Sequence, residues 1–88
     1  METKIIKKSR AGSFESNDLI VEIEPCENLE IIVTSVVFDM FGDQIKKVVE
    51  EVLNELDVKK AKVMIDDRGA LDYTIKSRVK TAVRRSSM

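Results

Sequence analysis

The period of the hydrophobic residues changes along this chain, and the changes restrict the folds that it can adopt. Apolar residues alternate with other residues in 19–24, which is typical of a strand with one buried face. Residues 29–37 form a second extended run rich in Ile and Val, and Ala61, Val63 and Ile65 alternate in a third. The Pro25–Asn28 segment between the first two runs favours a turn. The pattern therefore predicts three strands.

Two stretches repeat their apolar residues at intervals of three and four, which indicates helices. The first helix starts near Asp39 and ends at Asp57 and Val58, and Asp39 or Asp43 is its candidate N-cap. Met40 of this helix and Met64 of the third strand are expected to fill gaps in the core. Its apolar stripe comprises Phe41, Ile45, Val48, Val49, Val52, Leu53 and Leu56. The second helix follows a turn at 66–69, with a stripe of Leu71, Ile75, Val79, Ala82 and Val83.

The predicted order is thus β-β-α-β-α. The short link between the first two strands predicts an antiparallel hairpin, and a right-handed crossover through the first helix places both helices on one face. This is an α+β two-layer sandwich with a small three-stranded sheet. A length of 88 residues predicts one domain, 1–88, in which residues 1–18 form a flexible N-terminal arm and an exposed loop.

Composition argues against an autonomous enzyme. The chain has no His, so the commonest general base and metal ligand are missing, and a chain this short has little apolar material to spare for a deep pocket. The single Cys26 cannot form an internal disulfide. No apolar run approaches the length of about 18 residues that suggests a membrane span. We expect a cytoplasmic protein with no catalytic residue, no metal site and no membrane contact.

The net charge is only −1, but the charges are unevenly distributed. Residues 11–58 hold two basic and twelve acidic residues, whereas residues 59–88 hold nine basic and three acidic residues. The basic residues of the second helix that we expect to point outward are Lys76, Arg78, Lys80, Arg84 and Arg85. They form either a solvated face or a docking surface for an acidic partner. The acidic middle and the scarcity of aromatic residues argue against nucleic-acid binding.

Other candidate sites have simple structural interpretations. The glycines are isolated, so there is no phosphate-binding loop of the Gly-rich type. Asp66 and Asp67 could hold a divalent ion or act as acid and base, but neighbouring residues at a strand end point in different directions. A helix cap and a solvated turn are the simpler interpretation of these two residues. Cys26 is interpreted as a turn residue.

Ser16 is the remaining candidate. It lies between Glu15 and Asp18 in a loop that no core should bury, so its hydroxyl should be open to a modifying enzyme. Judged by composition alone, an ordinary turn serine is the simpler interpretation.

Three segments of this sequence resemble one family, the acyl carrier protein or gamma subunit of citrate lyase. They are Ala11-Gly12-Ser13-Phe14-Glu15-Ser16-Asn17-Asp18, Phe41-Gly42-Asp43-Gln44-Ile45 and Asp66-Asp67-Arg68-Gly69-Ala70-Leu71-Asp72. The third segment is the most specific, since it matches the family pattern Asp-Asp-Lys/Arg-Gly-Ala-Leu-Asp throughout.

This resemblance implies a non-catalytic carrier. In the family, a serine in Glu-Ser-Gly-Asp bears 2'-(5''-phosphoribosyl)-3'-dephospho-CoA through a phosphodiester, and Ser16 occupies that position. The thiol of the group is acetylated, exchanged to a citryl thioester by the alpha (transferase) subunit, and the citryl group is cleaved by the beta (lyase) subunit to oxaloacetate. Both subunits, a prosthetic-group transferase and an acetylating ligase are therefore implied as partners, in citrate fermentation.

The chain departs from the family at one position of this motif, where Asn17 replaces the glycine after the serine. Gly and Asn are the residues that most readily adopt positive φ, so the change suits a turn that needs this conformation. Three alternatives stay open at this point: a malonate decarboxylase acyl carrier, a small nucleic-acid-binding α+β domain that uses its basic last helix, and a regulatory interaction module with an unmodified Ser16.

Overall fold

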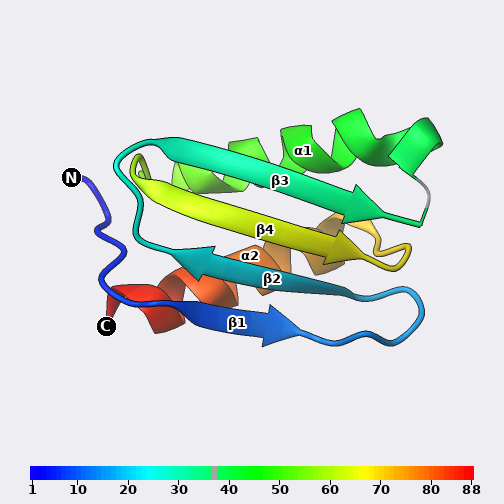
Figure 1. Cartoon of the computed structure of the whole chain (residues 1–88), viewed down its shortest axis with the longest axis horizontal. Helices are drawn as coiled ribbons and strands as arrows, with labels where there is room; N and C mark the ends of the chain where they lie inside the picture. The colour runs from blue at the N-terminus through cyan, green and yellow to red at the C-terminus, as the bar shows by residue number, and fades with distance from the viewer. Residues whose placement is uncertain (37) are drawn as a thin grey trace.

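The computed structural model describes the backbone of residues 1–36 and 38–88, and the side chains of residues 1–36 and 42–88. The elements follow the order β-β-β-α-β-α, with one strand more than the sequence predicted (Figure 1). They are β1 (Ser9–Gly12), β2 (Leu19–Glu24), β3 (Leu29–Ser35), α1 (Phe38–Glu55), β4 (Ala61–Asp67) and α2 (Asp72–Ser87).

The predicted hairpin of β2 and β3 is wrong. The sheet order is β1-β2-β4-β3, so β4 lies between these two strands, antiparallel to β2 and parallel to β3. The link from β2 to β3 passes across the start of β4, where the Ala61 amide donates to the Asn28 carbonyl at 3.1 Å (Figure 1). The burial of β4 explains its central place, because Ala61, Val63 and Ile65 are almost completely covered.

The strand that the prediction missed is β1, an edge strand that pairs antiparallel with β2. It has four residues and a polar composition, so it shows no alternating apolar signal. Residues before it are also attached to the body. Ile5 is buried, and the amides of Thr3 and Ile6 donate to the carbonyls of Asp57 and Ser86. The flexibility predicted for residues 1–18 stays a prediction.

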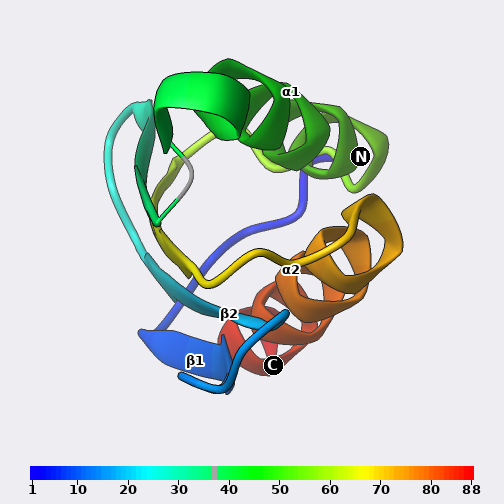
Figure 2. The ribbon, with the colours of Figure 1, turned by 90° about the vertical axis from the view of Figure 1, so that its right-hand side faces the viewer.

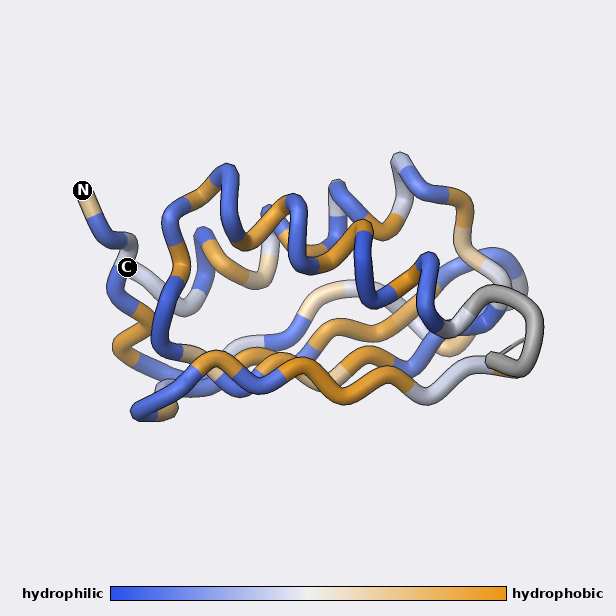
Figure 3. Tube along the Cα trace, turned by 90° about the horizontal axis from the view of Figure 1, so that it is seen from above, coloured by the Kyte–Doolittle hydropathy of each residue, from blue (hydrophilic) through white to orange (hydrophobic). Residues whose placement is uncertain are grey.

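Both helices cover the same face of the curved sheet, as expected for a two-layer α+β sandwich (Figure 2). Apolar residues collect between the helices and the sheet (Figure 3). The helices contribute Ile45, Val48, Val49, Val52, Leu53, Ile75, Val79, Ala82 and Val83 to this core. Leu71 was expected in the second stripe but is exposed. Met64 is only half-buried, because it points to the open face of the sheet, while the side chain of Met40 lies outside the described residues.

Both ends of α1 lie close to the predicted positions, but the predicted cap at Asp43 is wrong. Asp57 adopts a φ of 57°. Its amide donates to the Asn54 carbonyl, and the Val58 amide donates to the Leu53 carbonyl, which are the two bonds of a Schellman motif. Asp43 lies inside the helix and does not cap it, and the side chain of Asp39 lies outside the described residues.

Candidate functional site

Ser16 lies in the loop between β1 and β2, at the end of the molecule opposite to both chain termini (Figure 1). Its side chain is exposed. Within residues 1–36 and 38–88, its hydroxyl takes part in no hydrogen bond that would hold it back from a reagent. The exposure predicted from the sequence is therefore confirmed.

The loop around Ser16 is closed by its own hydrogen bonds. The Asp18 amide donates to the Glu15 carbonyl at 3.2 Å, which encloses Ser16 and Asn17 in a turn. Asn17 has a φ of 64°, the left-handed conformation expected from the glycine of the family motif. At the start of the loop, the Ser13 hydroxyl donates to Asp18 Oδ2 at 2.7 Å. Ser16 is thus presented by a defined turn.

Asp18 connects this loop to the last helix. Arg78 Nε donates to Asp18 Oδ1 at 3.0 Å, and Arg78 Nη2 donates to Oδ2 at 2.8 Å. These bonds are the main reason that the pKa of Asp18 falls from 3.8 to about 2. Burial acts against the fall in this pKa, whereas the Ser13 hydroxyl and the Leu19 amide add to it. The same pair raises the pKa of Arg78.

The serine loop is also joined to the turn between β4 and α2. The Asn17 amide donates to the Arg68 carbonyl at 2.8 Å, and the Arg68 amide donates to the Asp18 carbonyl at 2.9 Å. Gly69 has a φ of 89°, and a Cβ there would lie 3.6 Å from Asn17 Oδ1. Two of the three segments that resemble the family therefore form one hydrogen-bonded unit.

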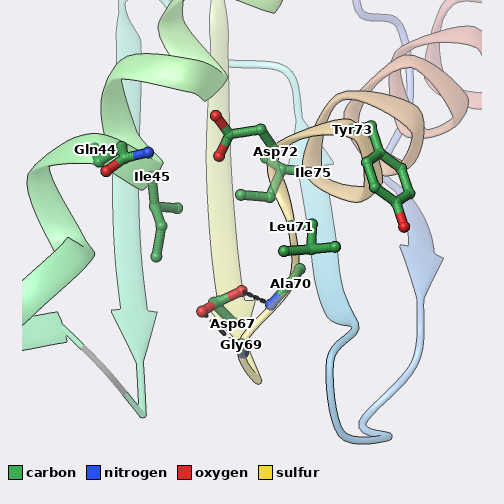
Figure 4. A pocket seen from close by; sticks show the side chains of 9 residues that line it. All are labelled: Gln44, Ile45, Asp67, Gly69, Ala70, Leu71, Asp72, Tyr73 and Ile75. Carbon is green, nitrogen blue, oxygen red and sulfur yellow. Dashed lines mark hydrogen bonds between the residues drawn. The ribbon is translucent and has the colours of Figure 1, made fainter.

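Asp67 organises the second half of this unit. Its carboxylate is buried and accepts a hydrogen bond from the Ser35 hydroxyl at 2.8 Å. It also accepts hydrogen bonds from the amides of Gly69 at 3.1 Å and Ala70 at 3.0 Å (Figure 4). The expected helix cap and solvated turn are wrong for this residue, since α2 begins after Leu71 with no side-chain cap. Asp66 instead forms an exposed ion pair with Arg68 at 3.3 Å.

The third family segment meets the second across an apolar cavity of about 600 Å³. Ile45 of α1 and Ile75 of α2 lie on opposite sides of it, and Ala70 and Leu71 line it near the turn (Figure 4). All three segments that carry the family resemblance thus lie at the same end of the molecule.

The remaining candidates do not assemble a catalytic site. Cys26 lies in the link after β2, with Sγ 4.0 Å from Glu30 Oε2. Among the described residues, no group of His, Cys, Asp and Glu side chains could hold a metal ion. On α2, Lys80, Arg84 and Arg85 are exposed as expected, whereas Lys76 and Arg78 are half-buried, and the guanidinium of Arg78 binds Asp18.

Sequence reasoning missed two of these side-chain roles. Asp67 carried a signal, because it continues the alternation of Val63 and Ile65 and so belongs to the buried face of β4. The pairing of Asp18 with Arg78 left almost no signal in the sequence. The two residues are sixty positions apart, and only the place of Arg78 beside Val79, at the border of the apolar stripe, hinted that it lies near the sheet.

Known proteins resemble this chain over nearly its whole length. The family described as "ACP: Malonate decarboxylase delta subunit (MdcD)" matches residues 6–86. The citrate lyase acyl carrier protein of Treponema denticola is 51% identical over 84 residues, which cover 96% of this chain and 97% of that protein. This chain belongs to the citrate lyase acyl carrier protein family. The family member of Pectobacterium atrosepticum is 46% identical over 85 residues, which cover 96% of this chain and 88% of that protein.

A solved structure shares the fold of this family member. It is a chain in the crystal structure of a Pseudomonas malonate decarboxylase hetero-tetramer in complex with malonate, with a TM-score of 0.81 and 20% identity. The match covers 96% of this chain and 88% of that chain. At this identity the likeness establishes the α+β fold alone.

Family membership decides the general role. Acyl carrier proteins of this family are non-catalytic subunits with a covalently bound prosthetic group, so this chain is a carrier and not an enzyme. A citrate lyase acyl carrier protein is part of a multi-subunit complex. In the described part of the chain, neither helix combines the length and apolar character that crossing a bilayer requires.

Proposed function

We propose that this chain is the acyl carrier subunit of citrate lyase and that Ser16 bears 2'-(5''-phosphoribosyl)-3'-dephospho-CoA. The observation that supports this most directly is the exposed Ser16 hydroxyl at the tip of a hydrogen-bonded turn. In the attachment, Oγ of Ser16 attacks the phosphate of an activated, phosphoanhydride form of this group: the new P–O bond makes Oγ a bridging oxygen of a phosphodiester, the anhydride bond breaks with release of its phosphate leaving group, and the hydroxyl proton is lost. The thiol of the bound group supplies the thioester chemistry.

The residues around Ser16 fit a bulky group attached at this position. The turn is anchored on one side by Asp18 with Arg78 and on the other by the backbone bonds of Asn17 with Arg68. Attachment at Ser16 breaks none of these contacts, so the carrier body keeps its shape when it is loaded. A rigid body with one exposed attachment point keeps its cargo at high effective concentration near docked enzymes.

The partners follow from this role. We propose that the chain works in the cytoplasm with the alpha (transferase) and beta (lyase) subunits, and that a prosthetic-group transferase and an acetylating ligase load it. The exposed basic residues of α2, Lys80 and Arg84 among them, offer a surface for acidic regions of these proteins.

A malonate decarboxylase carrier is the second candidate, because the matching family description and the solved neighbour name that enzyme. The curated relatives favour citrate lyase, since the family members of Treponema denticola and Pectobacterium atrosepticum are 51% and 46% identical to this chain. Purification of the tagged chain from its host separates the candidates. Copurifying citrate lyase subunits support the proposal, and decarboxylase subunits contradict it.

Intact-protein mass spectrometry tests the attachment site. Chain isolated from host cells that are cleaving citrate should show the added mass of one phosphoribosyl-dephospho-CoA, and the Ser16→Ala variant should lack it. Ser77→Ala, at an exposed serine of α2, is the matched control and should keep the added mass. An unmodified wild-type chain would contradict the carrier proposal, and added mass on Ser16→Ala would contradict the site alone.

A further inference from the structure

We propose that Arg10, Phe14 and Arg68 form a binding surface beside Ser16 for the phosphate and purine parts of a nucleotide. In the working protein the ligand is the nucleotide end of the prosthetic group, so this inference rests on the proposed function. The surface would hold the first part of the arm against the carrier body and leave the thiol end free.

The three side chains come from different elements and meet over the serine loop. Arg10 belongs to β1, Phe14 to the loop and Arg68 to the turn after β4. The guanidinium carbons of Arg10 and Arg68 each lie 5.6 Å from the centroid of the Phe14 ring. The backbone bonds between Asn17 and Arg68 fix this arrangement beside the attachment point.

The Phe14 ring is exposed beside the attachment point. Phe14 keeps 58% of its surface in contact with solvent, although a phenyl ring gains free energy when it is covered. An aromatic face flanked by guanidinium planes is a surface on which a purine base stacks. The ring is two residues from Ser16, and the purine of the proposed group is joined to Ser16 through a phosphate and two riboses, which keeps it near the ring.

The two guanidinium groups are available to phosphate oxygens. Arg10 lies 3.5 Å from Glu22, and Arg68 lies 3.3 Å from Asp66, in ion pairs whose side chains are partly open to water. Exposed pairs of this kind are weak, so a phosphate competes with the carboxylates at little cost. Arg78 differs, because its Nε and Nη2 atoms already donate to the two carboxylate oxygens of Asp18.

Titration of the unmodified chain with 3'-dephospho-CoA, followed by amide chemical shifts, tests this surface. We use the Ser16→Ala variant, so that covalent loading plays no part in the result. Shifts should concentrate in residues 10–17 and 66–69. Shifts spread over α2, or none at millimolar ligand, would overturn the proposal.

Substitutions then separate a specific surface from general attraction by positive charge. Arg68→Gln and Arg10→Gln should each weaken binding of 3'-dephospho-CoA at least fivefold, whereas Arg84→Gln, which removes an exposed charge on α2, should change it less than twofold. If Arg84→Gln weakens binding as much as Arg68→Gln, the proposal fails. Unchanged amide shifts outside the loop would show that each variant is folded.

A third comparison separates stacking from phosphate binding. Phe14→Leu keeps an apolar side chain and removes the aromatic face, so it should weaken 3'-dephospho-CoA and leave inorganic phosphate unaffected. Equal affinity of wild type and Phe14→Leu for 3'-dephospho-CoA would contradict the purine part. Because these measurements use unmodified chain, their failure is distinct from the absence of a covalent group at Ser16.

Discussion

Asp18 is the residue on which the geometry of the serine loop depends most. Its carboxylate accepts bonds from Arg78, from the Ser13 hydroxyl and from the Leu19 amide. Asp18→Asn keeps the size of the side chain but removes its charge and one of its acceptor oxygens. We expect this variant to lose about 1–2 kcal/mol of unfolding free energy at pH 7, measured by urea denaturation.

The pH dependence of this stability difference tests whether the charge of Asp18 is its cause. The pKa of Asp18 is about 2 in the folded chain against an ordinary value of 3.8. Because the folded value is the lower one, the stabilisation is fully present above about pH 4 and disappears as the pH falls toward 2. The difference between wild type and Asp18→Asn should shrink over this range. A difference that stays constant would contradict the ionic origin, and Glu50→Gln on the exposed face of α1 is the control.

Two glycines beside the site differ in why they are needed. Gly12 has a φ of 102°, and a Cβ there would lie 1.8 Å from the Leu19 carbonyl oxygen, whereas at Gly69 the nearest atom is 3.6 Å away. We expect Gly12→Ala to lower the free energy of unfolding by on the order of 3 kcal/mol, because the added Cβ clashes and the backbone is strained. Gly69→Ala should lower it by about 1 kcal/mol, from backbone strain alone. Thermal unfolding of both variants measures which one loses more stability. Equal losses would contradict the steric argument.

At the scale of elements, the turn between β4 and α2 depends on one buried carboxylate. Asp67→Ala removes the acceptor for the amides of Gly69 and Ala70, so we expect a loss of roughly 2–4 kcal/mol of unfolding free energy and faster hydrogen exchange at these amides. Asp66→Ala changes the neighbouring exposed residue and should cost less than about 1 kcal/mol. Similar losses of unfolding free energy in both variants would show that the Asp67 carboxylate does not hold the turn between β4 and α2.

Periodicity predicted both helices and the cores of β2, β3 and β4, because burial on one face leaves a clear alternation in the sequence. It did not predict β1, whose pairing rests on backbone bonds, nor the insertion of β4 between β2 and β3. Strand order depends on which faces bury most area in three dimensions. A short link between two strands suggested a hairpin, but the same link also reaches across one intervening strand.

The candidate site was predictable only in part and for a similar reason. Ser16 stood out by its place in a family motif, and the positive φ of Asn17 followed from the glycine that it replaces. The contacts that brace the loop, through Arg68 and Arg78, join positions about fifty and sixty residues away. Local patterns carry no information on such pairs.

At the scale of the whole molecule, the N-terminal segment attaches to the end opposite to the serine loop (Figure 1). Ile5 is 7% exposed and belongs to the core, while its neighbour Ile6 is 59% exposed. We expect Ile5→Ala to lose roughly 2–3 kcal/mol of unfolding free energy and Ile6→Ala less than about 0.5 kcal/mol. Urea denaturation measures both. If the two variants are equally stable, the segment is not part of the folded unit.

The backbone bonds that join Asn17 and Asp18 to Arg68 also determine when the turn around Ser16 can be completed. The turn that presents Ser16 is held by the backbone of Arg68, which is made about fifty residues later in synthesis, so a nascent chain contains the serine without these two bonds. If Ser16 is the attachment site, we expect an enzyme that recognises this turn to act only on folded chains.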